Sequence, residues 1–181
     1  RFPRTLQSEL VLRSHDEEDA DNLEAISGEP YVVEMPGEFE VKNIFVFGIR
    51  APLKREGKKG PVENLIFRIE AEGIYIAHLG ALDRALTDEE LQELNNIDIL
   101  MVPVGGERVM SPKVASEVIS QIEPRVVLPM TYKTGSLKEK LGTVEEFYKE
   151  VGACRKEEMN KYKVKRKDLP DEDMLIVTLS K

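Results

Sequence analysis

The stretch T-D-E-E-L-Q-E-L-N-N-I-D-I-L-M-V-P-V, from Thr87 to Val104, places a helix signal directly before a strand signal. Thr87 is followed three residues later by Glu90, the arrangement of a capping box, in which side chains and backbone at a helix start bond each other. Ile99–Val104 is a short apolar run, which is typical of a buried strand. A helix that leads into a buried strand predicts layers of helices on a sheet.

The same alternation continues toward the C-terminus. Ser111 and Pro112 open a second helix as N-cap and first helical residue. Leu137–Val151 predicts a third helix or helix pair ending at Gly152, and the charged segment Arg155–Asp173 predicts a surface helix and loop. Short β-branched or aromatic runs predict the remaining strands: Glu9–Arg13, Tyr31–Glu34, Glu38–Val41, Ile44–Ile49, Asn64–Glu70, Ile74–His78, Arg125–Met130 and Met174–Leu179.

Length and composition indicate one soluble globular domain over residues 1–181. Apolar residues make up 41% of the chain and charged residues 33%, and the net charge of −8 disfavours nucleic acid and anionic membranes as partners. The single cysteine, Cys154, excludes an internal disulfide and fits a cytoplasmic protein. No apolar run reaches the length of a membrane span.

The stretch R-S-H-D-E-E-D-A-D-N, from Arg13 to Asn22, has the composition of a cation-binding loop. It follows a predicted strand and places one histidine among several carboxylates, which are common metal ligands. The chain has only two histidines, His15 and His78, so any mechanism that needs three is excluded.

Several segments together resemble a known family. The segments Ser27–Val41, Ile69–Gly80, Ile97–Gly106 and Gln121–Thr134 are similar, in the same order, to segments of the small metallo-β-lactamase-fold proteins described as Zn-dependent hydrolases. The resemblance implies an α/β fold, a metallo-β-lactamase-like layered sandwich of sheet and helices. It also leads us to expect an N-terminal strand hairpin that this sequence, which begins at Arg1, does not include.

The resemblance implies a metal-binding loop of the form S-H-x-H-x-D-H. Ser14 and His15 match its start, and Asp19 matches its aspartate. Glu17 stands at the position of the second histidine, and Ala20 replaces the last one. Alanine has no donor atom, so the loop keeps His15 and Asp19 as its matching ligands.

The other ligand positions that the resemblance implies are replaced as well. Ala81 stands where the family's H-L-G-D motif supplies an aspartate, and Thr131 stands where its M-H-Y-K-T motif supplies a histidine. A further histidine is absent near Leu53. The sequence therefore predicts a vestigial metal site at His15 and Asp19, with no catalytic residue, no cofactor-binding residue and no expected cofactor; weak binding of a divalent cation stays open.

The leading prediction is a catalytically inactive pseudo-hydrolase that acts by binding an unknown small molecule or protein, or by forming a homo-oligomer. The main alternative is a metal-dependent hydrolase with an altered or mononuclear site at His15 and Asp19. A run of hard oxygen donors over Asp16–Asp21 could hold another cation, or could cap a helix that starts near Asp21 or Asn22. Metal-free catalysis would need Thr131–Lys133 to meet His15, or a Cys154 thiol activated by its basic neighbours.

Overall fold

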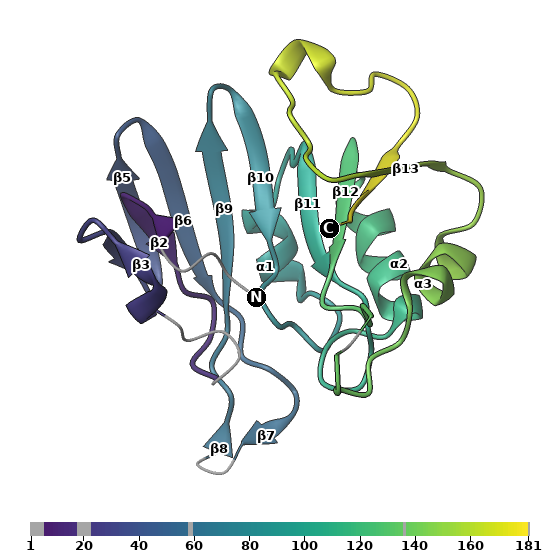
Figure 1. Ribbon diagram of the computed structural model, residues 1–181, viewed down its shortest axis with the longest axis horizontal. Helices are drawn as coiled ribbons and strands as arrows, with labels where there is room; N and C mark the ends of the chain where they lie inside the picture. Colours follow the sequence, from purple (N-terminus) through teal and green to yellow (C-terminus); the bar gives the residue numbers. More distant parts are fainter. Residues whose placement is uncertain (1–5, 18–22, 58–59, 136, 181) are drawn as a thin grey trace.

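The computed structural model describes residues 6–17, 23–57, 60–135 and 137–180 (Figure 1). An eight-stranded sheet runs across it in the order β13-β14-β12-β11-β10-β9-β6-β5. Its strands are β5 (Gly37–Val41), β6 (Ile44–Arg50), β9 (Leu65–Ala71), β10 (Ile74–His78), β11 (Ile99–Pro103), β12 (Val126–Met130), β13 (Arg155–Met159) and β14 (Leu175–Leu179). Neighbouring strands from β10 to β13 pair in parallel, whereas β5, β6, β9 and β10 pair antiparallel.

Short ladders accompany this sheet near the N-terminal part of the chain. They are formed by β1 (Leu6–Gln7) with β3 (Ile26–Ser27), by β2 (Leu10–Leu12) with β4 (Tyr31–Val33), and by the hairpin of β7 (Glu56–Gly57) with β8 (Gly60–Pro61). The described residues also form the 3-10 turns η1 (Leu23–Ala25) and η2 (Arg166–Asp168). The helix expected from about Asp21 is therefore a single short turn in its described part.

In the described part of the chain, three helices cover one face of the sheet: α1 (Asp88–Glu93), α2 (Pro112–Ile122) and α3 (Val144–Val151). The predicted capping box is confirmed, because Glu90 N donates to Thr87 Oγ1 and Thr87 N donates to Glu90 Oε2. The predicted Ser111 cap is confirmed by a bond from Val114 N, and Gly152 closes α3. None of the helices in the described ranges is long and apolar enough to cross a membrane.

Two predicted segments differ from the structure. Leu137–Val151 holds a helix only from Val144, because the helix starts at a second capping-box position, Thr143 with Glu146. Arg155–Asp173 does not begin as a helix: Arg155–Met159 is β13, the strand at one edge of the sheet. Its side chains are mostly charged and exposed, so it lacks the apolar alternation by which strands are found in a sequence.

The core lies on both faces of the sheet. On the helix side, Ile66, Leu100 and Val127 pack with Val118 and Phe147. On the other face, one cluster lies beneath β2 and β4 and contains Val33, Val46, Leu65 and Phe67. A second cluster lies beside η2 and contains Ile99, Val126, Leu169 and Val177. The parallel strands β10, β11 and β12 end at one common edge, where ligand sites of α/β sheets usually lie.

Candidate functional site

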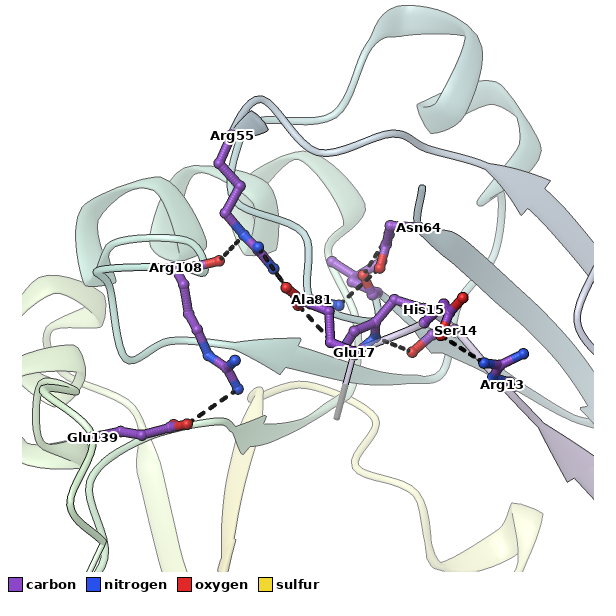
Figure 2. A network of polar contacts seen from close by, with 11 residues as sticks. Arg13, Ser14, His15, Glu17, Arg55, Asn64, Ala81, Arg108 and Glu139 are labelled. Atoms are coloured by element: carbon purple, nitrogen blue, oxygen red, sulfur yellow. Dashed lines mark hydrogen bonds and ion pairs between the residues drawn. The ribbon is translucent and has the colours of Figure 1, made fainter. Parts of the chain in front are cut away.

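The loop that follows β2 is held against the sheet by backbone hydrogen bonds. Arg13 N donates to Val33 O at 2.9 Å, which continues the β2–β4 ladder by one residue. Leu65 N then donates to Ser14 O at 2.7 Å, at the start of β9. These two bonds carry the chain from the small ladder to the main sheet and place His15 and Glu17 beside the segment that follows β10 (Figure 2).

His15 is largely buried in this loop, with 11% of its side chain exposed. Its Nδ1 lies 2.8 Å from Ser14 Oγ, and its Nε2 lies 3.9 Å from Glu17 Oε2. His15 is therefore held by a neighbouring hydroxyl and lies beside a carboxylate, a position that could serve either a metal ligand or a structural residue.

The dominant polar contact of the site is a two-pronged ion pair between Glu17 and Arg55. Arg55 Nη1 donates to Glu17 Oε1 at 2.8 Å, and Arg55 Nη2 donates to Glu17 Oε2 at 2.5 Å (Figure 2). Both side chains are 24% exposed. The Arg55 guanidinium holds the pKa of Glu17 below its usual value, and it does so against the opposing effect of burial. Both carboxylate oxygens of Glu17 are thus engaged by a protein cation.

Arg55 is itself fixed in position from several sides. The backbone N–H groups of Lys54 and Arg55 donate to the two carboxylate oxygens of Asp83 at 2.7 and 2.9 Å. Arg55 Nε donates to the carbonyl oxygen of Arg108 at 3.1 Å, and the Arg108 guanidinium lies 3.6 Å from Glu139. A guanidinium anchored in this way is part of the folded structure rather than a mobile surface group.

Ala81 lies in the loop after β10, and its backbone is anchored by the buried residue Asn64. Ala81 N donates to Asn64 Oδ1 at 2.9 Å, and Asn64 Nδ2 donates to Leu79 O at 3.4 Å. Gly80 has φ +63°, and a Cβ there would lie 2.2 Å from Asn64 Oδ1. The tight turn is therefore formed, while Ala81 supplies only a buried methyl group where the resemblance implied a carboxylate.

His78, at the end of β10, is the second histidine of the neighbourhood. Its Nδ1 accepts a hydrogen bond from Gly80 N at 3.1 Å. Burial, and then the nearby His15, lower the pKa of His78 from 6.5 to about 4. His78 is therefore neutral near pH 7, and its Nδ1 is engaged by the turn that carries Ala81.

Thr131 follows β12 with φ +53°, and its backbone packs on the loop after β11. A Cβ at Gly105 would lie 2.2 Å from Thr131 O, so the two loops touch through main-chain atoms. Ala81 and Thr131 thus both follow parallel strands at the same edge of the sheet. Asp19 and Ala20 lie outside the described residues, so their predicted places stay predictions.

The residues of the alternative sites, the acidic run, Tyr132 and Cys154, lie in different environments. Asp16, from the acidic run, bonds Arg13 at 2.9 Å, and Glu17 bonds Arg55, so both described carboxylates of that run face guanidinium groups. The pKa of Tyr132 is raised by burial and then by Tyr148, Glu158 and Glu145. Burial also raises the pKa of Cys154 against the weaker effect of Lys156, the opposite of thiol activation.

Sequence reasoning missed the residues that organise the site. Arg55 belongs to the basic stretch before the β7–β8 hairpin, which looks like an ordinary solvated connection, and Asp83 and Asn64 belong to no motif. The sequence held one signal for such a cation. A partly buried carboxylate needs a cationic partner, and Glu17 is a carboxylate where the family has a histidine. Within the described ranges, no group of three or more His, Cys, Asp or Glu side chains could hold a metal ion.

The chain has the metallo-β-lactamase fold. Helices cover one face of its mixed sheet, and a loop that carries a histidine lies at the ends of the parallel strands. Residues 2–131 match the family model described as the beta-lactamase superfamily domain, and the chain belongs to that family. The fold expected from the sequence is confirmed.

Solved structures share the architecture over most of the chain. A proposed Zn-dependent hydrolase of the metallo-β-lactamase superfamily from Thermotoga maritima is 29% identical, with a TM-score of 0.79 over 98% of this chain and 85% of that chain. A metallo hydrolase from Ignicoccus hospitalis is 18% identical with a TM-score of 0.58, covering 80% of this chain and 71% of that chain, a likeness of fold alone.

Curated relatives carry the name UPF0173 metal-dependent hydrolase. One from Thermococcus onnurineus is 39% identical over 67 residues, which are 36% of this chain and 30% of the relative. One from Archaeoglobus fulgidus is 31% identical over 87 residues, 48% of this chain and 37% of the relative. The matched segments span about a third of the length of these relatives.

Proposed function

We propose that this chain is a catalytically inactive member of its family, in which the Arg55 guanidinium takes the electrostatic place of the metal and the fold serves binding or self-association. The observation that carries the proposal is the two-pronged Glu17–Arg55 ion pair. It satisfies both oxygens of the carboxylate that stands at a ligand position of the family's metal-binding loop.

A fixed guanidinium opposes metal binding in two ways. It occupies the lone pairs of Glu17 that a metal would need, and its positive charge repels a divalent cation held nearby. Two unit charges 4 Å apart interact by about 4 kcal/mol at an effective dielectric constant of about 20, and the repulsion is larger for a divalent ion. Arginine also stays protonated at all working pH values, so this charge cannot be removed by a proton transfer.

A guanidinium does not replace a metal in chemistry. A hydrolytic zinc lowers the pKa of a bound water and leaves an open position for substrate. Arg55 has no such position, because a guanidinium carries only N–H donors and cannot coordinate a water oxygen as a metal does; three of its five N–H groups donate to protein oxygens. The site as described can therefore orient or bind, but it offers no group that makes hydroxide near neutral pH.

The second candidate is a metal-dependent hydrolase with an altered or mononuclear site at His15 and Asp19. It is favoured by the names of the relatives, which are metal-dependent hydrolases, and by the Thermotoga maritima structure at 29% identity. For this chain it would require His15 and Asp19 to bind a metal in the presence of Arg55.

A zinc titration against a chromophoric chelator distinguishes the two candidates. The parent chain is expected to show no competition, whereas the family ligand set restored by Glu17→His, Ala20→His, Ala81→Asp and Thr131→His, combined with Arg55→Met, gains measurable zinc affinity. The restored ligands with Arg55 retained form the matched control and bind more weakly. Stoichiometric zinc on the parent chain, or hydrolysis of ester, phosphodiester or lactam substrates that depends on His15, would support the second candidate instead.

A further inference from the structure

The edge strand β13 offers main-chain hydrogen-bonding groups to a neighbour. Among the residues that the structure describes, it is the outermost strand of the sheet and pairs on one side with β14. Ser180 N donates to Met159 O at 3.0 Å, so the polar backbone groups of Met159 point toward β14. Because successive residues of a strand alternate, Lys156 and Glu158 direct their N–H and C=O groups to the open edge.

The order of charges on β13 makes it complementary to itself. Its sequence is R-K-E-E-M, two cations followed by two anions. When two such strands lie antiparallel, the basic end of one meets the acidic end of the other. Opposite charges directly across an antiparallel pair are favourable and like charges are unfavourable, so this edge attracts a copy of itself instead of repelling it.

One register pairs the edge-directed backbone groups and places opposite charges across from each other at Lys156 and Glu158. Lys156 lies opposite Glu158 of the second copy, and Glu158 lies opposite its Lys156. Both are edge-directed residues, so each pair exchanges the reciprocal N–H···O bonds of a hydrogen-bonded antiparallel pair. The two Glu157 side chains meet at the centre of this register, and each is already ion-paired with Arg155 of its own strand.

The side chain of Lys156 is held in a suitable place beforehand. Its ammonium lies 4.9 Å from the centre of the Tyr148 ring and donates to Gly152 O at 3.2 Å, at the end of α3. The ion pair with Glu158 of a second copy would therefore form on the helix side of the sheet, with little further ordering of Lys156. The groove lined by Arg155, Glu157, Met159 and Tyr162 would lie along the opposite face of the joined strands.

The opposite edge of the sheet is built differently. β5 carries two exposed carboxylates, Glu38 and Glu40, and no basic residue. Two β5 strands side by side would bring only negative charges together, which is a common way to protect a sheet edge from association. The contrast singles out β13 as the edge that fits a copy of the chain.

We propose that two copies of this chain join through antiparallel pairing of β13 with β13, about a two-fold axis perpendicular to the sheet, so that the two sheets become one. A two-fold interface of this kind uses the same surface on both subunits. The inference gives the self-association part of the proposed function a surface and rests on that function; it makes no use of the metal loop.

Sedimentation equilibrium of the full chain tests the proposal. The interface is small, so we expect dimers at concentrations on the order of 100 µM. Glu157→Lys with Glu158→Lys makes the strand wholly cationic, and the dissociation constant should rise by about ten- to a hundredfold. Glu38→Lys with Glu40→Lys on β5 is the matched control and should leave the dissociation constant unchanged.

Two further variants separate charge complementarity from a loss of folding. Arg155→Glu with Lys156→Glu gives an anionic strand, and mixing it with the cationic variant should produce a heterodimer that neither forms alone. Exchanging all four charges restores a self-complementary order and should restore the dimer. A parent chain that is monomeric at every concentration, or a cationic variant that dimerises like the parent, would overturn the proposal; either result leaves the zinc titration, and with it the inactive metal site, untouched.

Discussion

Replacing Arg55 by methionine removes the cation of the candidate site while keeping a side chain of similar length. Glu17 would then keep its charge in a position where it is only 24% exposed and has lost both guanidinium bonds. Removing one partner of a fully buried pair costs about 3–5 kcal/mol, and an exposed pair contributes about 0–1 kcal/mol. For a pair of intermediate exposure we expect a loss of about 2 kcal/mol in the free energy of unfolding.

Urea unfolding at pH 7 measures this loss. With an m-value of about 2 kcal/mol/M, a loss of 2 kcal/mol lowers the urea midpoint by about 1 M. Glu17→Gln and the double variant complete a thermodynamic cycle, and we expect a coupling energy of about 1–2 kcal/mol between the two side chains. A coupling energy near zero would refute the assignment of Arg55 as the fixed partner of Glu17.

The chain supplies a matched control in Arg50. Arg50 also makes a two-pronged ion pair, with Glu63 at 2.8 and 2.6 Å, but these side chains are 62% and 60% exposed. Arg50→Met should therefore leave the urea midpoint unchanged, because exposed pairs are screened by solvent. Equal losses for Arg50→Met and Arg55→Met would show that burial of the Glu17 pair contributes nothing special.

Other predictions follow from the same contacts. Because Arg55 holds the pKa of Glu17 below 4.5, the stabilisation is present above that pH and is lost as pH falls through the lowered pKa, so the unfolding free energies of parent and Arg55→Met should converge in acid. The pKa of His78 is lowered to about 4, so NMR should find its imidazole as the neutral Nε2–H tautomer near pH 5. The unfolded chain binds this proton at a higher pH than the folded chain does, so the unfolding free energy should fall as pH drops from 6.5 toward 4. A charged His78 in the folded chain at pH 6 would contradict this. Asn64→Ala should cost about 1–3 kcal/mol in urea unfolding, because it orphans the buried N–H of Ala81; an unchanged midpoint would show that water replaces the amide.

Most of the central sheet could be predicted from the sequence, because its strands are apolar and short. Ile74–His78 was predicted to the residue, and Ile44–Ile49 differs from β6 by one residue. β13 could not be found in this way, since an exposed edge strand carries charges instead of an apolar pattern. The start of α3 could have been predicted from the sequence, because Thr143 and Glu146 have the spacing of a capping box.

The candidate site could be predicted only where it follows the family's motifs. The motifs led to His15, Glu17, Ala81 and Thr131, which the structure places in loops near the ends of the parallel strands, while Asp19 stays a prediction. They could not lead to Arg55, because its contact with Glu17 joins residues 38 positions apart through the fold and depends on a side chain outside every motif. Long-range pairing of this kind has no periodic signature in a sequence.

The metal content of the chain tests the central claim most directly. The chain is purified without chelator, desalted, and measured by inductively coupled plasma mass spectrometry against its protein concentration. If Arg55 stands in place of the metal, zinc, manganese and iron should each be far below one equivalent per chain. A stoichiometric metal that survives desalting, and that is lost in His15→Ala but kept in Arg50→Met, would contradict the claim.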